Sequence, residues 1–330
     1  MALSRMTYAA AAGEALAAAM RADPRVVAVG EDLGRGGVFG QYRSRAADGA
    51  LRPLQQEFGA ARIVDTPISE ANIMGAAVGM ALAGLRPVVE MRVIDFALCG
   101  MDELVNQAAK NRYMFGGQGR VPLVARMPIG IWTASAAQHS QSLEAWFAHL
   151  PGVVVVCPGT PQDNHGLLAS ALACGDPVVY LEHKELWSLR GEVDRGLDVP
   201  LGRARIARAG RDLTLVTWSR TLQESLKAAD ELAREGVDVE VIDLRTLWPW
   251  DRGTVLASAA RTKRLLVVHE AVQVAGFGAE VAATVAEELG CPVKRLGSPR
   301  SPVGYASTLG AEGRVDATEI ARAARAWLDR

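Results

Sequence analysis

The sequence is poor in cysteine and contains no long hydrophobic run. Its four cysteines stand far apart without CxxC spacing, which argues against a zinc cluster or a disulfide framework and suits a reducing, cytoplasmic setting. The chain has no apolar run of the roughly 18 residues that a bilayer span requires. The apolar stretch at residues 9–20 lacks a basic region of the signal-peptide type and indicates a first helix instead.

A surplus of charge of one sign is also lacking. Lysine and arginine total 36 and aspartate and glutamate total 37, for a formal net charge of -1. The net charge therefore gives no overall electrostatic attraction to nucleic acid or to a membrane surface. Three sequence motifs are missing as well: a GxGxxG turn opening a strand–helix–strand unit, a Walker A loop and a GxSxG turn. Their absence argues against the common dinucleotide, nucleotide and hydrolase sites.

What is present is an alternation of short apolar runs and helical stretches. The apolar runs are mostly continuous, which is typical of parallel strands covered on both faces. Strands are expected at residues 26–30, 87–93, 121–127, 153–157, 178–182, 213–218, 237–244, 264–269 and 292–296. Helices are expected at residues 69–85, 100–113, 140–148, 161–174, 221–235, 251–260, 277–289 and 318–328. The alternation predicts an α/β fold with doubly wound sheets.

The length and one turn-rich stretch predict two domains. At about 150 residues per domain, 330 residues are too many for one ordinary core. Residues 186–200 are rich in turn formers and separate two strand–helix series. We therefore expect one domain at residues 1–190 and a smaller one at 200–330. The glycine-containing residues 34–40 and the following residues 43–52 are expected to form a long loop.

Glu70 is the first residue with a pattern that suggests chemistry. It lies in Asp65-Thr-Pro-Ile-Ser-Glu70, where Ser69 is expected to cap a helix and Glu70 to stand in its first turn. One interpretation is compensation of the helix dipole, worth a few tenths to about 1 kcal/mol. The other is that the carboxylate faces a ligand nitrogen.

His139 is the second candidate. It lies in Gln138-His-Ser-Gln-Ser142, between a loop and a predicted helix. Functional groups in open α/β sheets commonly occupy such turns beyond the carboxyl ends of strands. The alternative is a histidine that is hydrogen-bonded to loop backbone. The residues alone thus predict two α/β domains with a carboxylate and a histidine, and they do not specify a reaction.

At these two motifs the chain resembles a known family, the beta subunits of thiamine-diphosphate-dependent 2-oxoacid dehydrogenases. The resemblance covers nearly the whole chain, and its ordered blocks make it specific. The blocks are Gly30-Glu-Asp32, Gly36-Gly-Val-Phe39, Asp65–Glu70, Ala83–Pro87, Asn106–Lys110, Arg112–Met114, Gln138–Ser142, Glu182–Lys184, Val241–Thr246, His269–Ala271 and Gly276–Glu280.

The resemblance implies a pyrimidine-binding domain at residues 1–190 and a transketolase C-terminal-type domain at 200–330. It implies that Glu70 hydrogen-bonds the aminopyrimidine ring of thiamine diphosphate and so helps to activate the cofactor. Phe96 then packs on the pyrimidine face, and Ile68 lines the same pocket. His139 resembles the histidine that assists acyl transfer to the lipoyl group of the next component.

The resemblance also implies that the active site is shared with another subunit. Thiamine enzymes hold the diphosphate through Mg²⁺ on a Gly-Asp-Gly stretch, which this sequence lacks. The diphosphate and Mg²⁺ ligands are therefore expected from an alpha subunit, in an alpha-two beta-two heterotetramer that serves a lipoyl-bearing acyltransferase. The family often holds a structural K⁺ near residues 168–177, but Ala173-Cys-Gly-Asp176 departs from the usual pattern and gives that ion little support.

Substrate choice is the least determined feature. Leu247-Trp-Pro-Trp-Asp251 resembles branched-chain members and favours a branched-chain 2-oxoacid over pyruvate. Trp132, close to His139, departs from the glycine-rich loop of the family and leaves room for a specialised acyl-transferring member. Three alternatives stay open: an acetoin dehydrogenase beta subunit, with which Tyr113–Gly117 is compatible, a split transketolase-type carboligase, and a non-catalytic scaffold.

Overall fold

The computed structural model describes residues 3–46 and 48–329 and divides the chain into two units. The first comprises Met1–Ile129 and Trp146–Leu201, and the second comprises Gly130–Ala145 and Gly202–Arg330. The segment Gly130–Ala145 thus groups with the second unit although it lies far ahead of residue 200. Each unit has its own hydrophobic core. Among the described residues, no helix has both the length and the apolar character that crossing a bilayer requires.

The first unit is built on a parallel sheet, as the continuous apolar runs predicted. Its strands follow the order β8-β9-β7-β6-β2-β5, and each neighbouring pair is parallel. Most of their residues are buried, which is expected for strands covered on both faces. The strands are β2 (Val26–Gly30), β5 (Ile63–Asp65), β6 (Arg86–Glu90), β7 (Val124–Ile129), β8 (Val154–Val156) and β9 (Val178–His183).

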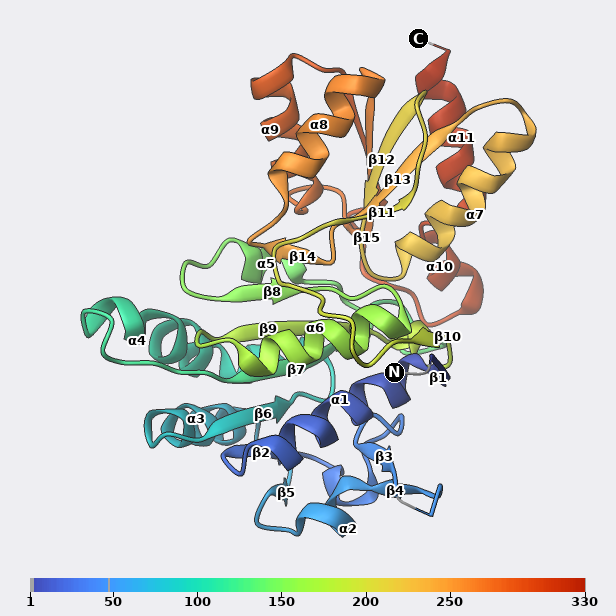
Figure 1. Cartoon of the computed structure of the whole chain (residues 1–330). Coiled ribbons are helices and arrows are strands. Elements are labelled where there is room, and N and C mark those ends of the chain that lie inside the picture. Colours follow the sequence, from blue (N-terminus) through green and yellow to red (C-terminus); the bar gives the residue numbers. More distant parts are fainter. Residues whose placement is uncertain (1–2, 47, 330) are drawn as a thin grey trace. The chain divides into compact units, whose positions relative to one another are not determined.

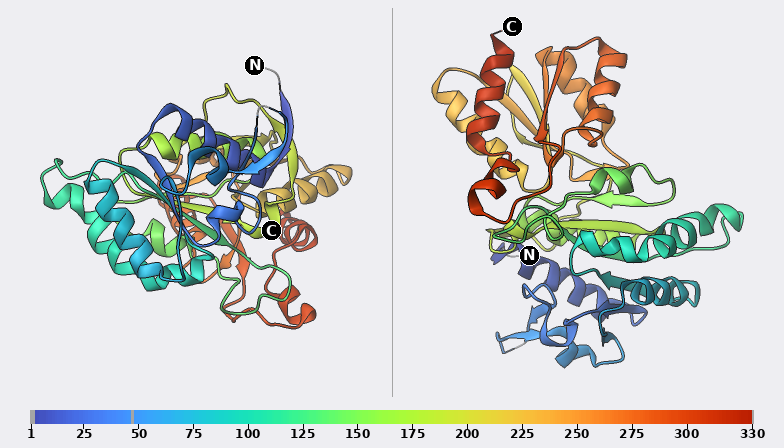
Figure 2. Two further views of the ribbon diagram at one scale, coloured as in Figure 1. Left: turned by 90° about the horizontal axis from the view of Figure 1, so that it is seen from below. Right: turned by 180° about the vertical axis from the view of Figure 1, so that it is seen from behind.

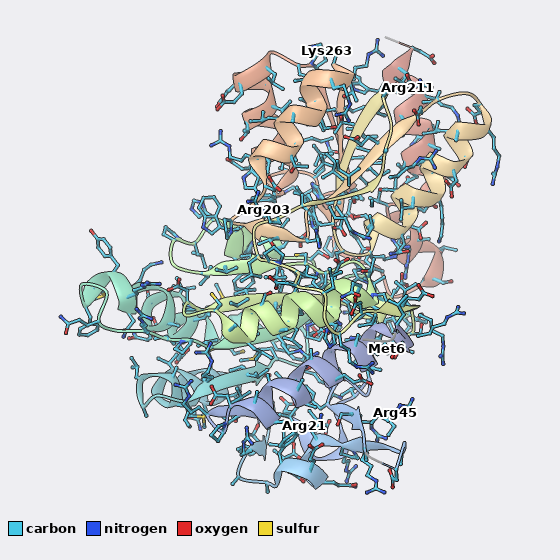
Figure 3. All side chains as sticks on the ribbon, viewed as in Figure 1. Met6, Arg21, Arg45, Arg203, Arg211 and Lys263 are labelled. Carbon is cyan, nitrogen blue, oxygen red and sulfur yellow. The ribbon has the colours of Figure 1, made fainter. Side chains whose placement is uncertain are left out.

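Helices cover this sheet. α1 (Tyr8–Ala22) and α6 (Pro161–Ala173) run side by side in Figure 1. Threonine caps both: the Thr7 hydroxyl accepts from the backbone N–H of Ala10 at 3.1 Å, and Thr160 caps α6 in the same way. α1 is tied to α2 (Leu54–Phe58) by an ion pair between Arg21 and Glu57 at 2.6 Å. Arg21 is labelled in Figure 3. α3 (Glu70–Leu82) packs against η2 (Ile94–Gly100) and η3 (Glu103–Ala108), which lead into α4 (Ala109–Met114).

Short antiparallel pairs complete the first unit and correct one prediction. Residues 34–52 do not form one long loop, because β3 (Arg43–Arg45) and β4 (Leu51–Pro53) pair as a hairpin after η1 (Leu33–Arg35). β1 (Ser4–Thr7) pairs with β10 (Arg190–Val193), which follows η4 (Lys184–Leu186). These strands are only three or four residues long, so they carry no recognisable alternation of polar and apolar residues.

The second unit has a five-stranded sheet of order β11-β13-β12-β15-β16, in which only β11 is antiparallel to its neighbour. In Figures 1 and 2, α7 and α11 lie on one face and α8 and α9 on the other. The strands are β11 (Arg205–Arg208), β12 (Leu213–Thr217), β13 (Val239–Asp243), β15 (Leu265–Val272) and β16 (Val293–Ser298). The helices are α7 (Thr221–Arg234), α8 (Arg252–Thr262), α9 (Gly278–Leu289), α10 (Ser307–Glu312) and α11 (Ala317–Leu328), and the short elements β14 (Thr246–Trp248) and α5 (Glu144–Ala148) complete the chain.

The structure confirms the α/β class and corrects two of the predicted helices. The helix expected at residues 140–148 begins only at Glu144, so the segment carrying His139 remains irregular for longer. The helix expected at 100–113 is a succession of 3-10, π and α turns. A π turn inside a helix is frequent at functional sites.

Candidate active site

The candidate site of the first unit lies at the carboxyl ends of three parallel strands. Gly30 ends β2 and is aligned with Asp65 at the end of β5 and with Glu90 at the end of β6. The residues that follow these strands therefore emerge at one edge of the sheet, the usual place for ligands in open α/β sheets. Glu31 follows β2, Thr66–Ser69 follow β5, and the segment containing Phe96 follows β6.

Gly30 is required by the close approach of β6. A Cβ atom at this position would lie 2.7 Å from the carbonyl oxygen of Glu90, closer than side chains are found, and φ at Gly30 is 156°. Two further hydrogen bonds fix the neighbouring segments: Thr66 N–H donates to the Gly30 carbonyl at 3.0 Å, and Leu33 N–H donates to the Asp65 carboxylate at 3.0 Å. The turn before Glu70 is thereby held against the end of β2.

Glu70 is the first residue of α3 and is half-buried. Ser69 occupies the cap position but does not act as expected, because its hydroxyl donates to the Pro67 carbonyl at 3.1 Å and makes no capping bond to the helix. The helix start thus lacks a side-chain cap, and Glu70 is the acidic residue of its first turn. Ile68 is 77% exposed, which is unusual for an isoleucine two residues from a half-buried carboxylate and is consistent with a surface that a ligand covers.

Phe96 belongs to η2, which packs on the start of α3. A Cβ atom on Gly100 would lie 3.2 Å from the Glu70 carbonyl oxygen and 3.1 Å from the Met74 side chain, so the two segments are in close contact. Phe96 is itself half-buried, and its N–H donates to the Val93 carbonyl at 3.1 Å. The structure therefore brings Glu70, Ile68 and the segment of Phe96 to one end of one sheet.

Glu31 is an acidic neighbour that was not identified as a site residue from the sequence. Burial raises the pKa of its carboxyl group, and the charge of Glu70 raises it further, while the Arg92 guanidinium opposes both effects. Arg92 is also paired with Asp32 at 2.6 Å. The charge of Glu70 is thus felt at Glu31, which favours the protonated form of Glu31. The available signal was the position of Glu31 directly after a buried strand.

His139 lies in the second unit, in the segment Gly130–Ala145. Its side chain is exposed, and its N–H donates to the Ala136 carbonyl at 3.4 Å. The segment closes on itself through a hydrogen bond from Gly130 N–H to the Gln141 carbonyl at 3.0 Å. Ala134 and Ala136 have φ values of 49° and 56°, a left-handed conformation that costs about 1 kcal/mol or more for each residue other than glycine. The segment is therefore strained.

The first-unit residues fit one end of thiamine diphosphate. A half-buried carboxyl group can hydrogen-bond an aminopyrimidine ring, and Ile68 and Phe96 offer apolar surface to its faces. No comparable set of residues is found for the diphosphate end of the cofactor among the described residues. The part of the chain described by the structure contains no group of three or more histidine, cysteine or acidic side chains that could hold a metal ion, and the sequence has no Gly-Asp-Gly stretch.

Both parts of the chain match known domain families. Residues 4–188 match the transketolase pyrimidine-binding domain, and residues 202–320 match the transketolase C-terminal domain. The chain is 41% identical over 328 residues to the beta subunit of acetoin:2,6-dichlorophenolindophenol oxidoreductase from Cupriavidus necator, covering 97% of each. It is 40% identical over 329 residues to the pyruvate dehydrogenase E1 component subunit beta from Bacillus subtilis, covering 97% of this chain and 98% of the relative.

A solved structure shares the fold. A split-gene transketolase, an inactive beta4 tetramer, superposes with a TM-score of 0.80 at 21% identity and covers 97% of both chains. The sequence similarity to curated relatives extends over both domains and nearly the full length of each relative. The chain therefore belongs to the family of thiamine-diphosphate-dependent 2-oxoacid and acetoin dehydrogenase beta subunits.

Proposed function

We propose that the chain supplies the pyrimidine-binding half of a thiamine-diphosphate site to an alpha-two beta-two enzyme that cleaves a small 2-oxo compound and transfers the acyl unit to a lipoyl group. The observation that carries the proposal is Glu70, half-buried at the start of α3 beside an exposed Ile68 and the segment of Phe96. A carboxylate with apolar neighbours is what a flat, nitrogen-bearing ring requires.

In this proposal Glu70 shares a proton with the aminopyrimidine ring, and Ile68 and Phe96 orient that ring. When bound, thiamine diphosphate supplies the electron sink for breaking the carbon–carbon bond next to the carbonyl group. Glu31 adds a second acidic group at this end of the sheet, and its raised pKa favours its protonated form beside Glu70.

His139 is proposed to assist the transfer of the acyl unit to the lipoyl group. Its exposed side chain and its position on a strained turn support this role. An imidazole has one nitrogen that can donate and one that can accept a hydrogen bond, and it can act as a general acid or base as the thioester forms. A lipoyl-bearing acyltransferase is therefore the second proposed partner, after the alpha subunit.

The alpha subunit is proposed to contribute the diphosphate and Mg²⁺ ligands. The lack of a Gly-Asp-Gly stretch in the sequence supports this division. The structural K⁺ gains no support, because the carboxylate of Asp176 is paired with Arg112 at 2.5 Å. A cation there would have to compete with that guanidinium.

The substrate is proposed only as a class, a small 2-oxoacid or acetoin. Trp250, in the stretch that favoured a branched-chain 2-oxoacid, is buried and packs edge-to-face on Phe277 with ring centroids 6.3 Å apart. Trp250 therefore has a packing role in the second unit, and its presence is weaker evidence for a branched-chain substrate. The preference for a branched-chain 2-oxoacid stays a prediction, and the two curated relatives described above act on acetoin and pyruvate by their names.

The test is reconstitution with a candidate alpha subunit from the same organism. Cleavage of pyruvate, 3-methyl-2-oxobutanoate and acetoin is measured with added thiamine diphosphate and Mg²⁺. We expect activity only from the pair, and a loss of at least about 100-fold in Glu70→Gln, which keeps the size of the side chain but cannot hold the acidic proton. Glu287→Gln, a substitution of an exposed residue, is the control. Full cofactor-dependent activity from this chain alone, or normal turnover in Glu70→Gln, would contradict the proposal.

A further inference from the structure

The segment Gly130–Ala145, which carries His139, is hydrogen-bonded near both of its ends to buried residues of the second unit. Near its start, the N–H of Ile131 donates to Glu270 Oε1 at 2.7 Å. Near its end, Glu144 is 1% exposed and accepts a hydrogen bond from Trp218 Nε1 at 3.1 Å. We call this stretch the histidine segment. Between the two anchors it exposes His139.

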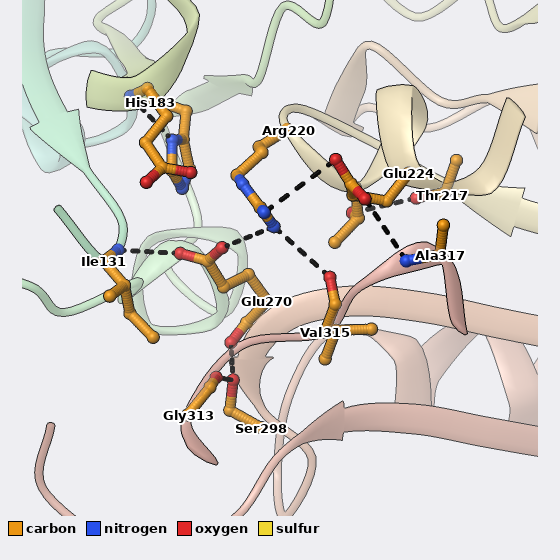
Figure 4. A network of polar contacts seen from close by, with 12 residues as sticks. Ile131, His183, Thr217, Arg220, Glu224, Glu270, Ser298, Gly313, Val315 and Ala317 are labelled. Carbon is orange, nitrogen blue, oxygen red and sulfur yellow. Dashed lines mark hydrogen bonds and ion pairs between the residues drawn. The ribbon is translucent and has the colours of Figure 1, made fainter. Parts of the chain in front are cut away.

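Glu270 is itself fixed by a network of polar contacts (Figure 4). Its second oxygen, Oε2, lies 3.3 Å from Nη1 of Arg220. Arg220 also donates to the Val315 carbonyl at 3.2 Å, and its guanidinium lies 3.9 Å from the Glu224 carboxylate. The Ser298 hydroxyl contacts the carbonyl oxygen of Glu270 itself. The acceptor of the Ile131 bond is thus immobilised through both its side chain and its backbone.

The network joins parts of the chain that are far apart in sequence. Glu270 lies on β15 and Arg220 directly before α7, and Glu224 accepts a hydrogen bond from the N–H of Ala317 at the start of α11. Gly313 adds a steric contact, because a Cβ atom there would lie 3.0 Å from Cδ1 of Ile131. The start of the histidine segment is therefore seated against the C-terminal part of the second unit.

Such anchoring is needed because the histidine segment is strained. Ala134 and Ala136 keep their left-handed backbone conformation only if surrounding contacts stabilise it. The hydrogen bond from the Ile131 N–H to the buried Glu270 is one of these contacts. We therefore expect its loss to let the segment leave the observed conformation.

We propose that Glu270, held by Arg220, is a positioning residue that sets the place of His139 through the backbone of Ile131. The inference rests on the proposed function, because it assigns to Glu270 control over the acyl transfer attributed to His139. A displacement of about 1 Å in a catalytic group can reduce a rate by about 100-fold. The expected signature is a loss of acyl transfer without an equal loss of substrate cleavage.

The first measurement is hydrogen–deuterium exchange on the alpha–beta complex, which does not depend on activity. Glu270→Ala removes the acceptor of the Ile131 N–H, and Glu280→Ala removes an exposed glutamate nearby on α9 as the matched control. We expect at least about tenfold faster exchange within the histidine segment in Glu270→Ala, with unchanged protection in β12 and β13. Unchanged exchange in that segment would overturn the anchoring.

The second measurement separates acyl transfer to a lipoylated domain from cleavage followed with an artificial electron acceptor. In Glu270→Ala we expect acyl transfer to fall by about 10–100-fold and cleavage by less than about threefold, with KM for the lipoylated domain nearly constant. Glu270→Gln, which keeps one acceptor oxygen, should recover part of the lost rate. Equal losses in both reactions, or no recovery in Glu270→Gln, would assign Glu270 a merely structural role.

A milder variant covers the case in which Glu270→Ala fails to fold. Trp218→Phe removes the donor to Glu144 but keeps an aromatic ring against His269, on which Trp218 stacks at 5.1 Å. It should release the far end of the histidine segment and lower acyl transfer in the same direction. If His139→Ala itself leaves acyl transfer intact, the proposed role of His139 fails, whereas the exchange data still decide whether Glu270 anchors the segment.

Discussion

Replacing Glu90 by glutamine should remove part of the pH dependence of stability. Glu90 ends β6 and is 6% exposed, and its two oxygens accept hydrogen bonds from Gln41 Nε2 at 3.1 Å and from the Tyr42 hydroxyl at 3.0 Å. Burial raises the pKa of Glu90 from 4.5 to about 7, although the nearby Arg126 guanidinium lowers it; the charge of Glu182 adds to the rise. The folded protein therefore favours the protonated form of Glu90.

The sign and size of the effect follow from proton linkage. Because the folded state binds the proton more tightly than the unfolded chain, the contribution of Glu90 is fully present below about pH 4.5 and is lost as pH rises through 7. The folded pKa exceeds the ordinary value by about 2.5, and each tenfold change in proton affinity is worth about 1.36 kcal/mol. The whole effect is about 3 kcal/mol, of which about 2 kcal/mol falls between pH 5.5 and 8.5.

The assay is urea unfolding at pH 5.5 and pH 8.5, followed by tryptophan fluorescence. Glu90→Gln cannot titrate, so its free energy of unfolding should fall less than that of the wild type over this range, by about 2 kcal/mol. The exposed Glu287→Gln should retain the wild-type pH dependence. Equal pH dependence in Glu90→Gln and wild type would show that Glu90 is ionised in the folded protein at neutral pH, and would refute the reasoning.

Three further predictions test other parts of the structure, one of them with a control substitution. His139→Ala should lower acyl transfer to a lipoylated domain by at least about tenfold and acceptor-linked cleavage much less; equal losses in the two assays would contradict the separate role. Gly30→Ala should cost at least about 2 kcal/mol of stability, because the new methyl group meets β6. Gly59→Ala shares a positive φ but meets nothing within 4 Å, so it measures the backbone strain alone. Glu144→Gln should reduce the pH dependence in the same sense as Glu90→Gln, since burial raises the pKa of Glu144 to about 7 and its contribution is likewise lost as pH rises.

The parallel sheets could be predicted because burial on both faces demands continuous apolar runs. Residues 26–30 form a strand as expected, and the strand expected at 213–218 extends over 213–217. Both sequences are uncharged and rich in aliphatic residues, which is typical of strands buried on both faces. The short strands could not be found in this way. β5 contains three residues, too few to show a period, and β1 pairs with β10, almost the whole length of the first unit away. Such short segments become strands because they hydrogen-bond to a partner strand, and their own sequences do not indicate this.

The candidate site was predictable to different degrees. Glu70 was recognisable because a carboxylate at a helix start after a strand is a local pattern, and Phe96 only because the chain resembles a family. The role of Ser69 was predicted wrongly, since a serine can satisfy its hydroxyl on the preceding loop as readily as on the helix. Glu31 escaped notice because its closeness to Glu70 arises from the parallel alignment of β2 and β5, 35 residues apart in register.

Glu270 shows why the remaining part requires the structure. The residue it holds, Ile131, lies 139 positions earlier in the chain, and nothing local to either residue indicates the contact. The strain at Ala134 and Ala136 is equally invisible in the sequence, because alanine carries no sign of a left-handed backbone. Together these two features explain why residues 130–145 group with the second unit although strands of the first unit precede and follow them. A strained segment keeps its conformation only through the contacts that anchor it, and here those contacts come from the second unit. The position of His139 therefore depends on the packing of the second unit, and not on β7 of the first unit, which directly precedes the segment.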